Sequence, residues 1–283
     1  QNLEREGLIK NKIFFLFYVF LKGEQKKLKA GKYYLSSSMT IPEIVQKIVS
    51  GETFKVKVTI PEGYTLKQIE KLLFEKRIIK EPLSQFKIKD FQEDFAFLRE
   101  APPENSLEGF LFPETYWFEP EMDAKEVTKV FLKTFEKKTK EIFTESQKQG
   151  KNFYEILIMA SLIEKEIFNT QNCPNCKNLV SGILWKRIKN RMPLQVDATI
   201  TYLTGKKTTK ISLEELQIES PYNTYKYLGL PPGPISNPSL ESVFAALNPQ
   251  ESDYWYYLSL PDGTTFFSKT LFEHNVKKAK YLE

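Results

Sequence analysis

The amino-acid sequence predicts an α+β protein, in which a small α+β module precedes a larger mixed α/β domain. Residues 1–80 show the order strand, turn and short helix twice over. Beyond residue 124, apolar side chains recur at helical spacing in several longer segments. Near the C-terminus, two β-prone runs flank Pro261-Asp262-Gly263, which is the pattern of a hairpin. A chain of 283 residues is long enough to bury a large core.

Within the first module, residues 32–35 favour a strand and residues 39–48 favour a short helix. Residues 54–60 alternate between apolar and polar side chains, as a half-buried strand does. A turn follows, and Thr65 is suited to cap a second short helix. The apolar run of residues 13–21 is shorter than the roughly 20 residues of a transmembrane helix, so we expect a core helix there.

The larger domain is predicted to be mostly helical. In chain order we expect a polar connector, an aromatic loop or edge strand at 109–118, helices at 124–143, 156–166, 179–189 and 213–218, a proline-rich loop at 221–238, a helix capped by Ser239, and a helical tail from Leu271. The proline-rich loop is unusually long, and such loops in compact domains are more often functional than idle. Its Tyr222, Asn223 and Thr224 carry groups that hydrogen-bond sugars, although a simple surface connector is the alternative.

Composition excludes several classes of function. The net charge of +5 is spread widely, and the chain lacks the Arg-rich helix of a nucleic-acid module, so we expect no nucleic-acid partner. A single histidine, His274, disfavours Ser–His and Cys–His hydrolases and most zinc enzymes. We therefore expect no metal and no cofactor. Cys173 and Cys176 form a lone CxxC, which is half a zinc site, a redox pair or a local disulfide; a loop staple or an idle thiol pair is favoured.

Glu166 is the strongest candidate for chemistry. If the apolar run that ends there is a helix, Met159, Leu162 and Ile163 lie on the same side as Glu166, because helical positions advance by about 100° per residue. Glu164 then points nearly the opposite way. A carboxyl held against apolar side chains has a raised pKa and can act as a general acid near neutral pH, which is the chemistry of glycosidic bond cleavage. The alternative is that Glu166 ends a helix and turns into solvent.

Several segments, taken in order, resemble the YceG-like endolytic murein transglycosylases. The matching segments are residues 108–116, 159–166, 194–202, 220–225 and 229–235, followed by Phe266 and His274-Asn275 near the C-terminus. Residues 29–33 and 60–63 resemble the marks of the family's LysM-like module. The resemblance implies a LysM-like module at 1–80, truncated at its N-terminus, a connector at 81–108 and a YceG-like catalytic domain at 109–283.

The resemblance also implies an activity. Such enzymes cut peptidoglycan glycan strands internally, between N-acetylmuramic acid and N-acetylglucosamine, and leave a 1,6-anhydro end. The family's catalytic residue corresponds to Glu166, which would act first as general acid and then as general base. The resemblance further implies a single-pass anchor in the cytoplasmic (inner) membrane through a segment upstream of Gln1, a catalytic domain facing the periplasm or cell wall, and a link to cell-wall synthesis proteins.

Further residues are candidates for substrate binding. We expect four side chains to hold the sugars, namely Gln195, Tyr222, Asn223 and Thr224. Asp197 and Glu114 are also expected to bind substrate, and either is a candidate second carboxylate if the enzyme is instead a muramidase hydrolase. The remaining alternative is a non-catalytic wall-binding scaffold, in which Glu166 is solvated or forms a salt bridge with Lys165 or Arg187.

Two departures from the family bear on the local geometry. The loop after Glu166 is longer than usual, and the insertion contains Cys173 and Cys176. The family's Asp-Pro-Thr is replaced by Asp197-Ala198-Thr199. Neither change removes a carboxylate that the mechanism needs.

Overall fold

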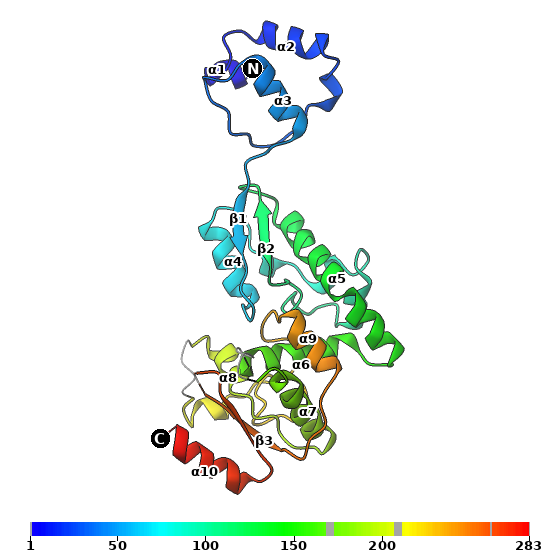
Figure 1. The fold of residues 1–283 in the computed structure, drawn as a ribbon, viewed down its shortest axis with the longest axis vertical. Coiled ribbons are helices and arrows are strands. Elements are labelled where there is room, and N and C mark those ends of the chain that lie inside the picture. The colour runs from blue at the N-terminus through cyan, green and yellow to red at the C-terminus, as the bar shows by residue number, and fades with distance from the viewer. Residues whose placement is uncertain (1, 168–172, 207–210, 261, 283) are drawn as a thin grey trace. The chain divides into compact units, whose positions relative to one another are not determined.

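A computed structural model describes residues 2–167, 173–206, 211–260 and 262–282 (Figure 1). The chain divides into two compact units. The first comprises Gln1–Val58, Leu73–Lys80 and Tyr116–Asp123. The second comprises Thr59–Leu72, Glu81–Thr115 and Ala124–Glu283. Helices alternate with two small sheets, so the α+β fold class is confirmed at that level.

The N-terminal part contains helices α1 (Asn2–Arg5), α2 (Lys12–Leu21) and α3 (Ile41–Ser50). The predicted helix α3 is confirmed, and its start follows from a capping box. Glu43 accepts hydrogen bonds from the Thr40 backbone N–H at 2.7 Å and from the Thr40 hydroxyl at 2.8 Å. α2 and α3 pack together over Ile44 and Val45. Strand β1 (Val56–Thr59) and strand β2 (Thr115–Phe118) then form a two-stranded sheet, which confirms the strand predicted at 54–60. Of residues 109–118, predicted to be an aromatic loop or an edge strand, only the last part is a strand.

Two expectations for this part are wrong. Residues 32–35 form no strand, because the Lys32 carbonyl accepts one hydrogen bond, from Phe54 at 2.7 Å, and no ladder continues from it. The run 13–21 does form helix α2, but it is not a core helix, because only Phe15 and Val19 are buried. The other large apolar side chains are 58–69% exposed, namely Ile13, Phe14, Leu16, Phe17, Phe20 and Leu21. Among the residues that the structure describes, no helix combines the length and apolar character that a membrane crossing requires.

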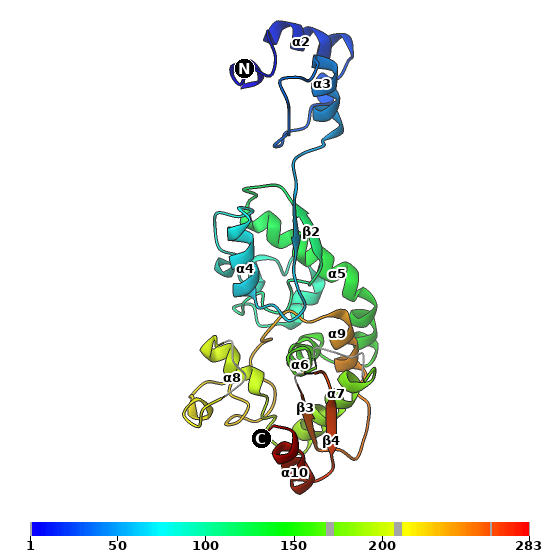
Figure 2. The same ribbon diagram turned by 60° about the vertical axis from the view of Figure 1, so that its left-hand side comes forward.

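The second unit is built around helix α6 (Phe153–Glu166), whose residues from Ile156 to Glu164 are all buried. The Asn152 side chain caps it by accepting the Glu155 N–H at 3.0 Å. Figure 2 shows α6 beside α7 (Cys176–Lys189) and α9 (Leu240–Leu247). Helices α5 (Ala124–Lys148) and α8 (Asp197–Thr204) also pack against α6. The helices predicted at 124–143, 156–166 and 179–189 are confirmed, as is the helix capped by Ser239.

The remaining elements close the second unit. Strands β3 (Tyr256–Ser259) and β4 (Thr265–Ser268) pair antiparallel, with Tyr257 opposite Phe267, and α10 (Leu271–Tyr281) packs on them. This confirms the hairpin and the helical tail; Pro261 of the predicted turn lies outside the described residues. Helix α4 spans Leu66–Glu75 as predicted. Short 3₁₀ helices occur at Gln25–Lys27, Leu83–Gln85, Ile88–Asp90, Ala96–Glu100 and Glu215–Gln217, so the helix predicted at 213–218 is one 3₁₀ turn.

Candidate active site

Glu166 is the last residue of α6 and is half-buried there. Two groups donate hydrogen bonds to its carboxyl, the backbone N–H of Ala198 and the hydroxyl of Tyr257. The charges of Asp197 and Arg187 also act on it. Four segments far apart in sequence therefore meet at one carboxyl: the ends of α6 and α7, the start of α8, and β3.

The pKa of Glu166 is raised to about 7, mainly because burial disfavours the charged form. The negative charge of Asp197 raises this pKa as well. The Tyr257 hydroxyl, the Arg187 charge and the Ala198 N–H act in the opposite direction, because each of them stabilises the carboxylate. Near neutral pH the group therefore populates both its protonated and its charged form, as a group that donates and then accepts a proton must.

The start of α8 is fixed by the proline-rich loop. The amide groups in the first turn of a helix have no partner within the helix, which leaves the Ala198 N–H free to face Glu166. Gln195 adopts a left-handed conformation with φ of 52° just before this turn. Its N–H donates to the Thr224 carbonyl at 3.1 Å, and the Val196 N–H donates to the Thr224 hydroxyl at 2.9 Å.

Arg187 ties three segments together beneath the site. Its guanidinium is buried and donates to the Trp255 carbonyl at 3.0 and 2.7 Å, and to the Leu194 carbonyl at 2.7 Å. The bonds to Trp255 hold the segment that leads into β3, and the bond to Leu194 holds the segment that leads into α8. These carbonyls engage Nε, Nη1 and Nη2, and Arg187 acts on Glu166 through its charge.

The structure brings Asp197 into the same site as Glu166. Asp197 is exposed at the first position of α8 and accepts a hydrogen bond from the Tyr225 hydroxyl. Burial raises the pKa of Tyr225, and the bond to Asp197 raises it further, so this phenol stays protonated. Gln195 is exposed beside them, two residues before Asp197.

Other predicted residues have different surroundings. Asn223 and Thr224 are fully buried. The Asn223 amide donates to the Leu216 and Ile218 carbonyls at 3.0 and 2.9 Å, so this side chain holds the proline-rich loop in shape. Tyr222 is half-buried in the same loop, with its ring 5.4 Å from that of Tyr202.

Glu114 belongs to a separate group of side chains. It lies just before β2 and accepts a hydrogen bond from Lys138 of α5 at 2.6 Å and from the Thr115 N–H at 3.0 Å. The bond to Lys138 is the main cause that lowers the pKa of Glu114. Its surroundings therefore favour a charged, surface-paired carboxylate rather than an acid. A role in substrate binding for any of these residues stays a prediction.

Glu164 has partners entirely different from those of Glu166, as the helical spacing predicted. Its Oε2 accepts the Ser239 N–H at 3.0 Å and the hydroxyls of Ser239 and Ser242, each at 2.6 Å. Lys177 of α7 lies 3.5 Å from the same oxygen and 3.1 Å from Glu241. This side of α6 is therefore occupied by a buried polar network that joins α6, α7 and α9.

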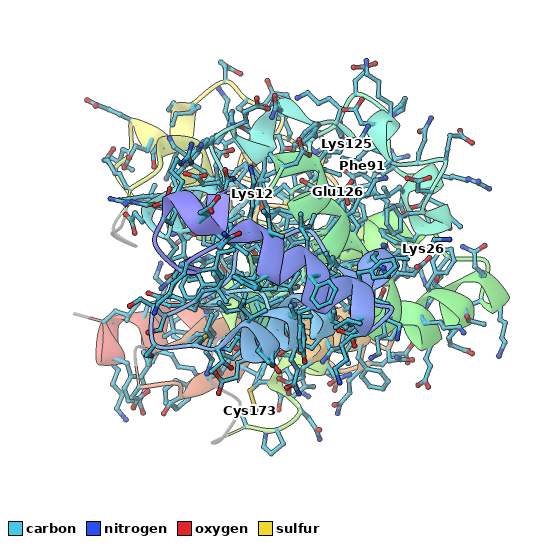
Figure 3. The ribbon with its side chains drawn as sticks, turned by 90° about the horizontal axis from the view of Figure 1, so that it is seen from above. Lys12, Lys26, Phe91, Lys125, Glu126 and Cys173 are labelled. Atoms are coloured by element: carbon cyan, nitrogen blue, oxygen red, sulfur yellow. A yellow bond between two sulfur atoms is a disulfide. The ribbon has the colours of Figure 1, made fainter. Side chains whose placement is uncertain are left out.

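Cys173 and Cys176 form a disulfide, which decides between the alternatives for this pair (Figure 3). Cys176 is buried as the first residue of α7, so the bridge closes a short loop where this helix begins. Among the described residues, no three or more His, Cys, Asp and Glu side chains are placed to hold a metal ion.

Sequence reasoning missed the Tyr257 hydroxyl and the Ala198 N–H, and it considered Arg187 only as a salt-bridge partner. No local pattern marks Tyr257, which is one of many aromatic residues near β3. The sequence offered a partial signal for the Ala198 N–H: Asp197 begins a helix, and the first amide groups of a helix have no partner within it. Arg187 carried a weaker signal, a cation in the last turn of a helix.

The fold and this site together define an α+β protein with a half-buried carboxyl of raised pKa at the end of a buried helix. The chain belongs to the YceG-like family, whose family model matches residues 1–280.

Three relatives show the extent of the similarity. The chain is 34% identical to the endolytic murein transglycosylase of Bacillus subtilis (strain 168), over 99% of this chain and 80% of that protein. It is 30% identical to the endolytic murein transglycosylase of Streptococcus pneumoniae serotype 2 (strain D39 / NCTC 7466), over 99% of this chain but 55% of that protein, so it spans little more than half of that relative. A crystal structure of a yceG-like protein from Listeria monocytogenes matches with a TM-score of 0.68 at 34% identity, covering 98% of this chain and 93% of that chain.

Proposed function

We propose that this chain is a peptidoglycan lytic transglycosylase that cleaves glycan strands internally between N-acetylmuramic acid and N-acetylglucosamine. The observation that carries the proposal is the half-buried Glu166 carboxyl, whose pKa is raised to about 7. The names of the relatives from Bacillus subtilis and Streptococcus pneumoniae support the choice of murein as substrate.

In the first step, protonated Glu166 donates its proton to the glycosidic oxygen while the bond from that oxygen to the anomeric carbon breaks. The leaving sugar departs with a free hydroxyl, and Glu166 becomes a carboxylate. The Ala198 N–H, the Tyr257 hydroxyl and the Arg187 charge all stabilise this carboxylate. They are already in place before the proton leaves, so little rearrangement is needed as the charge forms.

In the second step, the 6-hydroxyl of the muramic acid attacks its own anomeric carbon. The Glu166 carboxylate takes the proton of that hydroxyl, which restores the acid and closes the 1,6-anhydro ring. No water enters the product, so one catalytic carboxylate is enough. The exposed Asp197 carboxylate lies in the same site and would stabilise the positive charge that develops at the anomeric carbon.

Two alternatives to this mechanism make different demands on the site. Because Asp197 acts electrostatically on Glu166, a muramidase would use Asp197 as its second carboxylate and would add water to the product. A non-catalytic scaffold would hold Glu166 as a charged carboxylate in a closed ion pair. The raised pKa of Glu166 and the engagement of Arg187 by backbone carbonyls both favour the enzyme.

The wider assignments belong to the same proposal. We assign residues 1–80 to a LysM-like module that holds or orients the glycan, with a catalytic domain at 109–283. Action on peptidoglycan places the catalytic domain outside the cytoplasm. The membrane anchor upstream of Gln1 and the link to cell-wall synthesis proteins stay predictions from the family resemblance.

The proposal is tested by digesting purified peptidoglycan with the parent protein and with Glu166→Gln, and by analysing the products by mass spectrometry. Glu155→Gln is a matched control, because Glu155 is exposed in the first turn of the same helix. We expect anhydro-ended fragments from the parent and the control and none from Glu166→Gln. Binding without products from the parent would favour the scaffold.

A further inference from the structure

Helix α8 presents a partly exposed face that leads away from Glu166. Ala198, whose N–H meets Glu166, and Tyr202 are four residues apart and so lie on the same side of the helix, about 6 Å apart along its axis. Both are partly exposed, whereas Thr199 and Ile200 are buried. A ligand that reaches Glu166 along α8 would therefore contact Tyr202.

Tyr202 belongs to a group of three tyrosines, which we call the tyrosine cluster: Tyr154, Tyr202 and Tyr222. The rings of Tyr202 and Tyr222 are 5.4 Å apart and inclined by 39°. The Tyr154 hydroxyl accepts a hydrogen bond from the Asn105 amide at 3.0 Å, and Asn105 also donates to the Pro232 carbonyl at 3.1 Å. The cluster therefore joins residues from α6, α8 and the proline-rich loop.

Two hydroxyls of the cluster, those of Tyr154 and Tyr222, lie close to Gly233. A Cβ atom at this position would lie 2.9 Å from both the Tyr154 and the Tyr222 hydroxyl, and 3.8 Å from the Asn105 amide nitrogen. Gly233 has an ordinary φ, so only the lack of space disfavours a side chain. Glycine at this position thus lets two phenol oxygens and one amide come together.

The cluster suits a neutral ligand rich in hydroxyl groups. Burial raises the pKa of Tyr222 to about 12 and also raises that of Tyr202, so both phenols stay protonated. Among the described residues, neither of these two hydroxyls has a hydrogen-bond partner. Protonated phenols donate and accept hydrogen bonds, and their ring faces pack against apolar C–H groups, so together they match the two kinds of surface on a sugar.

We propose that the tyrosine cluster and Asn105 bind one N-acetylated sugar ring of the glycan strand that Glu166 cleaves, on the side of the site to which α8 leads. This inference rests on the proposed function for the nature of the ligand. The recognised part is the sugar backbone and not the stem peptide, because the contributing groups are phenols, an amide and ring faces. Tyr202 supplies the ring face, the hydroxyls of Tyr202 and Tyr222 supply hydrogen bonds, and Asn105 holds the Tyr154 hydroxyl in place.

Binding to a non-cleaving protein tests the subsite directly. The probe is glycan strands from which an amidase has removed the stem peptides, titrated into Glu166→Gln and into the same protein with Tyr202→Ala, Tyr202→Phe, Tyr222→Phe or Gly233→Ala. We expect about tenfold weaker binding for Tyr202→Ala and for Gly233→Ala, and about threefold weaker binding for each Phe variant, as expected for losing one or two modest contacts. Tyr281→Ala in α10 is the control and should bind as the background protein does.

Steady-state rates then separate a binding role from a structural one. In the parent background, Tyr202→Phe should raise KM for the stripped strands and leave kcat unchanged. Unchanged affinity in the Tyr202 and Gly233 variants, or no binding of stripped strands by Glu166→Gln, overturns the subsite. If the parent yields no anhydro product but binding still depends on Tyr202, the proposed function fails and the subsite stands. If the parent yields anhydro product but binding does not depend on Tyr202, the subsite fails and the proposed function stands.

Discussion

The two carboxylates near the end of α6 lie two residues apart and have opposite surroundings. Glu164 is buried with Lys177 and accepts hydrogen bonds from Ser239 and Ser242. Glu166 meets a backbone amide and a phenol, with Asp197 as a negative neighbour. Glu164 is buried and Glu166 is half-buried, but of the two only Glu164 has a lysine that ion-pairs with it. Burial therefore yields an acid only where no directly bonded cation compensates the charge.

The largest effect is expected from Glu166→Gln, because the amide cannot donate a proton as an acid does. The rate of anhydro-product formation should fall by about a thousandfold or more, as expected for loss of a general acid–base group. The melting temperature should remain close to that of the parent. Residual activity within about tenfold of the parent would show that another residue supplies the proton.

Lys177→Met tests how much the lysine beside Glu164 stabilises that buried carboxylate. The substitution leaves a buried carboxylate without its lysine, so the free energy of unfolding should fall by about 3–5 kcal/mol. Urea denaturation measures the loss, and adding Glu164→Leu to Lys177→Met should recover much of it. The folded variant should still form anhydro product at low temperature. A loss below about 1 kcal/mol would mean that the serine hydroxyls alone stabilise Glu164.

The pH dependence of the parent's rate and stability tests the raised pKa of Glu166. Because the pKa of Glu166 is about 7 and the first step needs its protonated form, the rate should fall by about tenfold for each pH unit well above 7. The folded pKa lies above the unfolded value of 4.5, so the stability due to this proton is complete below pH 4.5 and is lost as pH rises through 7. Denaturation from pH 5 to 8 should show a smaller decline in Glu166→Gln than in the parent, because the buried Glu108, whose pKa is raised to about 8, contributes to the decline in both proteins. A rate that stays constant up to pH 9 would contradict the assignment.

The smallest effect is expected from the disulfide at the start of α7, the helix that carries Lys177. The bridge spans a sequence separation of 3, and a loop this short contributes about 2 kcal/mol at most. The double variant Cys173→Ser/Cys176→Ser should therefore melt slightly earlier and keep the parental rate. If the double variant and the parent treated with a reductant lose rate to the same extent, the disulfide is needed for the geometry of the active site.

The sequence was sufficient for the elements that local patterns specify. The spacing of Leu162, Ile163 and Glu166 predicted both the helix and the separation of Glu164 from Glu166, and Ser239 marked the start of α9. It was not sufficient where distant segments meet. The Tyr257 hydroxyl, the Ala198 N–H and the Arg187 charge reach Glu166 only through tertiary packing, which no local periodicity encodes.

Two wrong expectations have the same origin. The apolar run of α2 indicated a core helix, but a helix of this length packed on one side buries only Phe15 and Val19. Residues 32–35 have strand composition but meet no strand that could extend the ladder. Asn223 and Thr224 illustrate a related point, since their polar side chains bond backbone groups of Leu216, Ile218 and Val196, which precede the proline-rich loop.

The central claim is that one carboxyl, Glu166, cleaves the strand without water. The most direct test is digestion of purified peptidoglycan in water enriched in heavy oxygen, with mass spectrometry of the new muramic acid ends. The account predicts anhydro ends that carry no heavy oxygen, and none at all with Glu166→Gln. Reducing ends that carry one heavy oxygen would contradict it and would identify a hydrolase, with Asp197 as the first candidate for the second carboxylate.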